Sequence, residues 1–439
     1  MITFMAYLLI AVFMVLIMTK KMTPFTALLV IPAAFAVIGS LLGFWGGDIG
    51  KFALDGLKTT SVTAIMLLFA VLFFTLMIDA GLFDPLSNAM IRFAKGDPLK
   101  VMLATVILSA GVSLNGDGTT TMIIVCSAFV PIYKKLKMRM LDLAVLTILS
   151  HSVLNLLPWG GPTARVITVL ELDESAVLRG LVPMMIFATI YMIIVSIIMG
   201  LGERKRLGIV NFTEEQLKEM TTIVDPELLS IRRPKNLYIN LVLTTIVIIM
   251  LILGTLPSSI IFMGATALGV LINYPNLKDQ RARIEANAPD AAQVSMVVMS
   301  AGVFMGILSG TGMGDAIATS MTTIIPASWG KFWCLIVALI SAPGTVFLSN
   351  DAFYFGVLPL LAETGKAYGF TPIQLGFASL MGQAFHLLSP LVPFIYVLLR
   401  LTDVDMGQWQ RKSALWAIGI FVIYIVVGAL FGLMPLVLI

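Results

Sequence analysis

The chain has 439 residues, of which 59% are hydrophobic and only 12% are charged. Soluble domains average about 25% charged residues, so this composition excludes a large soluble domain and indicates a protein that crosses a membrane several times. The net charge of +4 is therefore interpreted as a sign of membrane topology and not of nucleic-acid binding.

Apolar stretches long enough to cross a bilayer recur along the whole chain. About 20 apolar residues are needed for one helical span. Two of the stretches are interrupted by prolines, one late in each half of the chain. The ten predicted spans are 2–19, 24–43, 60–79, 140–170 (broken), 178–201, 237–254, 257–274, 291–309, 372–400 (broken) and 413–436.

Two further apolar regions have arms too short to cross the membrane, and each surrounds a polar tip. Residues 100–132 contain SLNGDGTTT (113–121), and residues 330–362 contain FLSNDAFYFG (347–356). Membranes tolerate non-helical backbone where it is buried in protein or lines a cavity. We therefore predict a re-entrant hairpin in each region.

The distribution of Lys and Arg predicts which loops face the cytoplasm. With the N-terminus outside and each hairpin returning to its own side, most of the 28 basic residues fall inside. Six lie on or near the outer side: Lys51, Lys58, Arg165, Arg179, Lys331 and Lys366. We therefore predict a multi-pass protein of the cytoplasmic (inner) membrane with both termini outside.

The two halves of the chain show matching patterns. Asp84 and Asp315 are 231 positions apart, as are Pro162 and Pro393. Each half has five spans, an odd number, so the second half enters the membrane from the opposite face. The sequence thus predicts an all-α fold of two inverted repeats, each with five transmembrane helices and one hairpin. The predicted units are a first repeat over 1–201, a cytoplasmic linker over 202–236 and a second repeat over 237–439.

The first hairpin tip carries polar groups suited to a ligand. Gly116 lets the backbone approach a ligand closely, Asn115 supplies donors and an acceptor, and Thr119 supplies a hydroxyl. The helix that begins at Thr119 points its N-terminus at the tip and favours an anion. Asp117 adds a carboxylate, which is costly in hydrocarbon and therefore indicates a function.

The second tip, Ser349-Asn350-Asp351, repeats this chemistry. One such tip alone is also typical of an ordinary polar turn, whereas a matching pair favours a transport site. A desolvated carboxylate binds a proton more readily than an exposed one, so Asp117 and Asp351 are predicted to bind a coupling ion or a metal.

Both broken spans have sequences that cannot form a regular helix. LPWGGPTAR (157–165) has two prolines and two glycines, which remove backbone hydrogen bonds. The freed carbonyls can bind a cation, so Gly160, Gly161 and Thr163 are predicted substrate contacts. A single proline break is often only a kink, but HLLSPLVPF (386–394) gives the second half an equivalent break.

Two more side chains adjoin the breaks. Arg165 follows the first break, where its guanidinium either binds a substrate carboxylate or reaches the outer membrane surface. His386 begins the second motif, where it either carries a coupling proton or packs between helices. Both are secondary candidates for substrate binding.

Three motifs together resemble a known family. SLNGDGTTT, NLLPWGGPTAR and LSNDAFYFGVLPLL are similar to those of the CitMHS family of citrate–metal complex/proton symporters, in the ion transporter superfamily. The resemblance covers essentially the whole chain. It implies uptake of citrate as a complex with Mg²⁺ or Ca²⁺, driven by protons, with no permanently bound cofactor. It also implies a homodimer with an elevator-type mechanism, in which a transport domain moves past a scaffold.

The resemblance extends to the related divalent anion/sodium symporters, whose hairpin tips carry Ser-Asn-Thr. The two tips of this chain depart from that pattern, because each has an aspartate. Asp117 and Asp351 put sodium coupling in doubt and suit a proton or a metal-bearing substrate. Two alternatives stay open: a Na⁺-coupled symporter of another organic anion, and a cation/proton antiporter. An enzyme is not expected, because no nucleophile–base pair or metal-ligand cluster is present in the sequence. Whether the two aspartates bind metal, carry protons or divide these tasks is left open.

Overall fold

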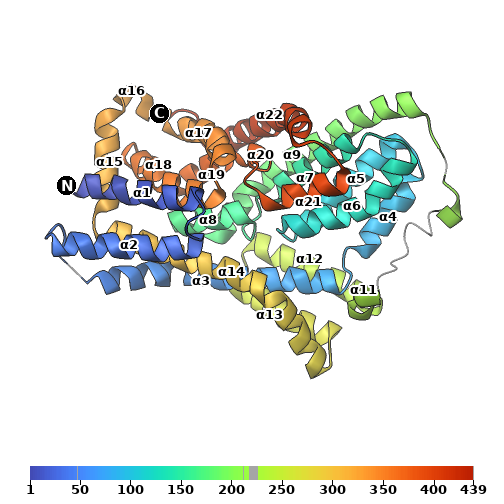
Figure 1. The fold of residues 1–439 in the computed structure, drawn as a ribbon, viewed down its shortest axis with the longest axis horizontal. Helices are drawn as coiled ribbons and strands as arrows, with labels where there is room; N and C mark the ends of the chain where they lie inside the picture. Colours follow the sequence, from blue (N-terminus) through green and yellow to red (C-terminus); the bar gives the residue numbers. More distant parts are fainter. Residues whose placement is uncertain (47, 211, 217–225, 439) are drawn as a thin grey trace.

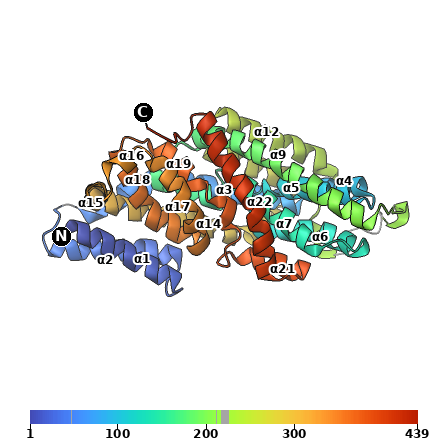
Figure 2. The same cartoon turned by 90° about the horizontal axis from the view of Figure 1, so that it is seen from above.

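In the computed structural model, residues 1–46, 48–210, 212–216 and 226–438 are described, and their regular structure is entirely helical. Most of the helices run along the long axis of the molecule (Figures 1 and 2). Within these described residues, six helical segments are long and apolar enough to cross a membrane, which bears out the predicted all-α, multi-pass class. They are α2 (Pro24–Leu41), α3 (Ile49–Asp79), α9 (Glu174–Leu207), η1 with α12 (Pro234–Leu253), α14 (Leu277–Gly310) and α22 (Met406–Leu430).

The other helices are shorter and include the hairpins and the broken spans. They are α1 (Ile2–Met18), α4 (Asp84–Ala94), α5 (Pro98–Ser113), α6 (Gly118–Lys135), α7 (Met140–Leu154), α8 (Gly161–Leu170), α11 (Pro226–Ile231), α13 (Ser258–Asn273), α15 (Met313–Ile324), α16 (Ala327–Gly330), α17 (Trp333–Phe347), the π-helix η2 (Ala352–Val357), α18 (Leu358–Ala367), α19 (Pro372–Leu380), α20 (Gln383–His386) and α21 (Pro393–Thr402). Within η1–α12, η1 covers Pro234–Asn236 and α12 covers Leu237–Leu253.

Several helices extend beyond the predicted spans. α3 begins at Ile49 instead of 60, α14 begins at Leu277 instead of 291, and α9 continues to Leu207 instead of 201. The added turns carry charged residues, which remove them from a hydropathy window without disfavouring helix. Hydropathy therefore marks the apolar part of each helix and not its ends.

The predicted linker 202–236 is partly helical, because it holds the end of α9, all of α11 and η1. Residues 211 and 217–225 of this linker, including Lys218, lie outside the described residues. Arg233 in the described part donates to the Asn273 carbonyl at 2.8 Å and so fastens the linker to α13.

α3 and α14 pack closely because both have glycines where they meet. A Cβ atom built on Gly56 would lie 2.1 Å from the Gly302 carbonyl oxygen, and one built on Gly306 would lie 2.3 Å from the Phe52 carbonyl oxygen. Small residues allow this backbone approach between membrane helices. Larger side chains at either glycine would force the helices apart.

Each predicted hairpin is a pair of helices joined by a short polar tip. α5 and α6 are joined by residues 114–117, and α17 is joined to η2 and α18 by residues 348–351. The broken spans leave residues 155–160 between α7 and α8, and 387–392 between α20 and α21. The two halves therefore share one order of elements: a long helix, a short helix, a hairpin, a broken span and a second long helix.

The hairpins pack crosswise. α6 of the first hairpin packs against α21, which follows the second break, and η2 and α18 of the second hairpin pack against α8, which follows the first break. Neither half could build this arrangement alone.

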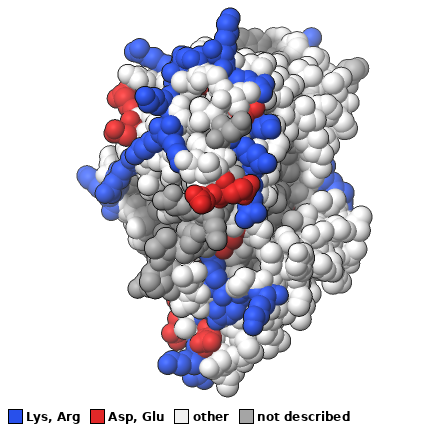
Figure 3. All heavy atoms as spheres, turned by 90° about the vertical axis from the view of Figure 1, so that its right-hand side faces the viewer, with Lys and Arg blue, Asp and Glu red and all other residues white. Residues whose placement is uncertain are grey.

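One end of the molecule is rich in basic side chains. Figure 3 shows Lys and Arg gathered on the end that lies to the right in Figure 1. α6 and α9 both end here, where the Arg206 guanidinium donates to the Lys137 carbonyl at 3.0 Å. Lys134, Lys135 and Lys205 are exposed nearby in the sequence.

Candidate functional site

The first hairpin tip is fastened to the first break. The Trp159 indole Nε1 donates to the Leu114 carbonyl at 2.8 Å. Gly116 has a φ of +77°, and a Cβ atom built on it would lie 3.2 Å from the Trp159 carbonyl oxygen. The backbone conformation and the close approach therefore both require glycine at this position.

Asn115 is buried at this tip and has an unused donor. Its Oδ1 accepts a hydrogen bond from the Asp117 amide at 2.7 Å. Its Nδ2 is buried and has no partner among the described residues. Because a buried donor without an acceptor is costly, this amide is suited to bind a substrate oxygen.

Asp117 differs from the expectation of a desolvated carboxylate, because the residue is exposed. Its carboxylate accepts from the Thr119 and Thr120 amides at 3.4 and 2.7 Å and so caps α6. Capping of this kind stabilises a helix by roughly 1 kcal/mol. The helix N-terminus that was expected to face an anionic ligand already holds Asp117, and Thr119 is exposed beside it.

The first break is closed around its own backbone. Gly160 lies so close to the preceding residues that a Cβ atom would be 2.2 Å from the Asn155 carbonyl oxygen. The buried Thr163 hydroxyl donates to the Leu156 carbonyl at 2.7 Å, which satisfies an acceptor freed by the break. Gly161 offers its carbonyl to the Arg165 Nη1, at 2.6 Å.

Arg165 joins the two halves of the chain. Its Nε and Nη2 lie 2.8 and 2.7 Å from Oδ1 of Asp351, which is 186 positions away. The side chains are only 21% and 17% exposed, and the guanidinium carbon is 6.0 Å from the centre of the Phe355 ring. Arg165 therefore points into the site and not to the membrane surface. Two residues that were predicted separately, one for substrate and one for an ion, bind each other.

The second tip is held by Gln383, which the sequence reasoning missed. Gln383 Nε2 donates to Asn350 Oδ1 at 3.0 Å and to the Tyr354 hydroxyl at 2.8 Å, while its own Oε1 is buried without a partner among the described residues. The Ser349 hydroxyl accepts from the Ala352 amide at 3.2 Å. The available signal in the sequence was an amide side chain within an apolar run, three residues before His386.

Each of the two histidines contacts the helix that leads into one of the tips, α17 for His386 and α5 for His151. His386 Nδ1 is 2.7 Å from the Thr345 carbonyl oxygen, so this nitrogen carries the proton and links α20 to α17. His151 Nδ1 lies 2.9 Å from the Ser113 hydroxyl, and its Nε2 is buried with no partner in the described part of the chain. Its ring packs edge-on against Phe394, with centroids 5.5 Å apart.

No group of three or more His, Cys, Asp and Glu converges anywhere in the described ranges. Mg²⁺ and Ca²⁺ prefer six or more oxygen ligands. Asp117 and Asp351 therefore do not belong to a ready-made divalent site of the protein, and a divalent cation held here would need oxygens from its own ligand.

Paired tips, paired breaks and a charged pair between them, together with six membrane-length helical segments among the described residues, define a polytopic membrane transporter and not an enzyme. A family model described as "Citrate transporter" matches residues 8–382. The chain belongs to this family, CitMHS.

Two relatives from Bacillus subtilis (strain 168) match along their whole length. A "Citrate transporter" is 44% identical, with 99% of both chains covered. A "Mg(2+)/citrate complex secondary transporter" is 36% identical, with 98% of this chain and 99% of the relative covered. Among solved structures, the Alcanivorax borkumensis YdaH transporter is similar in fold, with a TM-score of 0.57, 14% identity and 88% of each chain covered.

Proposed function

We propose that this protein imports citrate as a complex with a divalent cation, by proton symport, through a site built from both halves of the chain. The names of the two Bacillus relatives support citrate and its Mg²⁺ complex as the substrate. The single observation that carries the mechanism is the ion pair between Arg165 and Asp351.

Charge balance favours the metal complex over free citrate. Citrate has three carboxylates, so its complex with a divalent cation has a single net negative charge. Arg165 is the only Lys or Arg in the four motifs 113–121, 157–165, 347–356 and 386–394. One guanidinium balances the complex, whereas free citrate would leave two charges uncompensated in a partly buried site.

The ion pair provides a route for proton coupling. Ionised Asp351 forms an ion pair with Arg165, so the guanidinium cannot bind substrate at the same time. A proton on Asp351 removes that charge and frees Arg165 to bind a citrate carboxylate through two parallel hydrogen bonds. An unpaired guanidinium is costly in a buried site, so proton and substrate bind together. This is the requirement for symport.

The neighbouring polar groups suit the remaining oxygens of the complex. Asn115 Nδ2 is a free donor at one tip, and Gln383 holds Asn350 at the other. In this proposal, the Gly161 carbonyl orients Arg165 toward the substrate, Gly160 allows the break to pack tightly, and the Thr163 hydroxyl stabilises it. Asp117, at the exposed mouth, attracts the cation of the incoming complex.

Transport by this site requires that it face each side of the membrane in turn. We infer that the two halves are inverted repeats, and that the hairpins and broken helices form one unit that moves past a scaffold of α1, α2, α12 and α13. The shared order of elements and the crosswise packing of the hairpins support this proposal. A homodimer in the cytoplasmic membrane, with the basic end of Figure 3 inside, completes it.

Counterflow of labelled citrate in proteoliposomes tests the substrate and the ions. We expect exchange that needs Mg²⁺ or another divalent cation and continues when Na⁺ is replaced by K⁺. Uptake that needs Na⁺ and ignores divalent cations would instead identify a sodium symporter. Absence of citrate exchange under every ion condition, with cation/proton exchange present, would identify an antiporter.

A further inference from the structure

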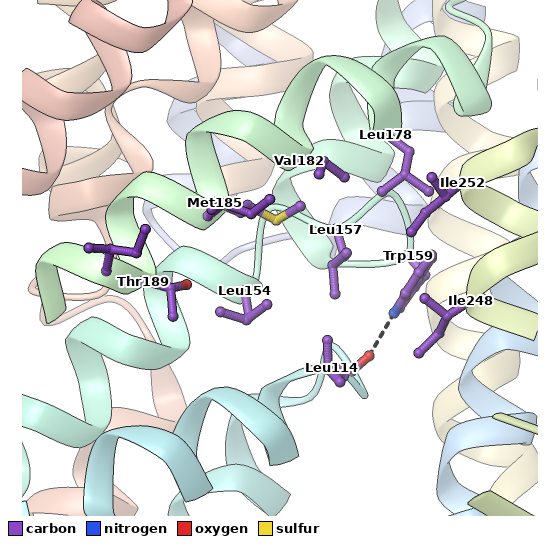
Figure 4. A pocket seen from close by; sticks show the side chains of 12 residues that line it. Leu114, Leu154, Leu157, Trp159, Leu178, Val182, Met185, Thr189, Ile248 and Ile252 are labelled. Carbon is purple, nitrogen blue, oxygen red and sulfur yellow. Dashed lines mark hydrogen bonds between the residues drawn. The ribbon is translucent and has the colours of Figure 1, made fainter. Parts of the chain in front are cut away.

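An apolar cavity of about 320 Å³ lies behind the first tip and the first break. Figure 4 shows side chains from α9, from α12 and from the first break around it, with the Trp159–Leu114 hydrogen bond at one edge. Cavities of this size bind small apolar ligands or parts of larger ones. The lining residues are Leu114, Leu154, Leu157, Trp159, Leu178, Val182, Met185, Ile186, Thr189, Ile190, Ile248 and Ile252.

The cavity reaches the surface of the molecule beside α9, where two of its lining residues are exposed. Ile186 and Ile190 line it and are 53% and 47% exposed. Both belong to α9, a membrane-length helix, so their exposed sides face lipid. A molecule that enters by this route comes from the bilayer and not from water.

The cavity has the length of one membrane leaflet. Its lining on α9 runs from Leu178 to Ile190, which corresponds to a rise of about 18 Å at 1.5 Å per residue. One leaflet contributes about 15 Å of hydrocarbon. A lipid acyl chain fits this span from the headgroup level to the bilayer centre.

The guanidinium of Arg179 lies at the end of the cavity that corresponds to the lipid headgroups. Arg179 follows the lining residue Leu178, is exposed, and makes no salt bridge with any residue that the structure describes. A Cβ atom built on Gly254 would lie 3.0 Å from the Arg179 Nη1, which places the guanidinium beside the end of α12, two residues from the lining residue Ile252. The apolar cavity thus ends at a free positive charge.

We propose that this cavity binds one acyl chain of an anionic phospholipid, whose phosphate pairs with Arg179. Charge complementarity selects the anionic headgroup, and the apolar lining selects the chain. That chain passes along Trp159 and Leu114, which line the cavity and fasten the first tip to the first break. The lipid therefore stabilises the site from behind and would move with it or leave when it moves.

Photo-crosslinking tests this site directly. Phosphatidylglycerol with a diazirine near the end of one acyl chain is reconstituted with the full-length protein, illuminated and mapped by peptide mass spectrometry. We expect labels on α9 and α12 residues of the cavity, several-fold above labels on Ile418 and Val422, which are exposed on α22. Phosphatidylcholine with the same chain should label the cavity several-fold less.

Two variants and a matched control identify the contacts. Arg179→Gln removes the headgroup partner, and Ile186→Trp fills the opening, so each should lower cavity labelling several-fold. Arg281→Gln removes an exposed arginine of α14 far along the chain and should leave labelling unchanged. Cavity labelling no higher than on α22, or unchanged in Arg179→Gln, would overturn the proposal, and the second result is independent of whether Ile186→Trp folds.

Discussion

At the scale of single residues, the proposed roles of Asp351 and Arg165 depend on their contact with each other. Each was identified in the sequence by its own surroundings, a polar tip and a proline break. Their contact, at 2.7–2.8 Å across 186 positions, is a property of the tertiary fold that no local pattern reports. Gln383 was not predicted for the same reason, because its partners Asn350 and Tyr354 belong to the second hairpin, about 30 positions earlier in the chain.

Replacing Arg165 with Lys should lower citrate transport at least tenfold. A lysine keeps the charge but cannot contact Asp351 and the Gly161 carbonyl through three nitrogens as Arg165 does. Each lost hydrogen bond to a charged group is worth about 1.5–3 kcal/mol. Counterflow of labelled citrate measures the effect, with Arg400→Lys, an exposed arginine of α21, as the control. Wild-type rates in Arg165→Lys would remove the specific role of the guanidinium.

Replacing Gly116 with Ala should weaken both the fold and substrate binding. An alanine at a φ of +77° costs about 1–2 kcal/mol, and its Cβ would press on Trp159. The midpoint temperature of thermal unfolding in detergent and the affinity for citrate should both fall. The control is Gly202→Ala in α9, where a Cβ meets no atom within 4 Å and alanine should stabilise the helix slightly. Equal stability and equal citrate affinity in the two variants would contradict the requirement for glycine at position 116.

At the scale of elements, the sequence predicts the tips and the breaks better than the ends of the helices. Glycine and proline act locally, so SLNGDGTTT and LPWGGPTAR themselves predict the interruptions at 114–117 and 155–160. Helix ends in this chain depend on charged turns outside the apolar stretch, as at the start of α14. Asp117 shows a second limit, because its position at a tip predicts a polar role but not that it caps α6.

Trp159→Phe tests whether the first tip must be fastened to the first break. The ring would keep its packing against Phe74 and Phe262, whose centroids lie 5.8 and 5.4 Å away, but would lose the hydrogen bond to Leu114. A bond of this kind contributes about 1 kcal/mol, so citrate affinity should fall about fivefold. Trp329→Phe, at an exposed tryptophan, is the matched control. Unchanged affinity in Trp159→Phe would show that the tip needs no such anchor.

At the scale of the whole molecule, the proposed orientation makes opposite ends accessible to opposite solutions. A membrane-impermeant maleimide should label Lys331→Cys in intact cells and should label Lys205→Cys only after the membrane is opened. Background labelling should be low, because Cys126 and Cys334 are 1% and 0% exposed. The reverse pattern would invert the proposed topology and the direction in which the halves enter the membrane.

Proton-driven accumulation by the Asp351→Asn variant tests the coupling mechanism most directly. In proteoliposomes with a pH gradient and Mg²⁺, wild-type protein and the exposed control Asp315→Asn should accumulate labelled citrate. Asparagine cannot exchange a proton, so Asp351→Asn should keep citrate counterflow at equal pH but lose accumulation driven by the gradient. Accumulation at the wild-type level in Asp351→Asn would contradict the role of the Arg165–Asp351 pair in coupling.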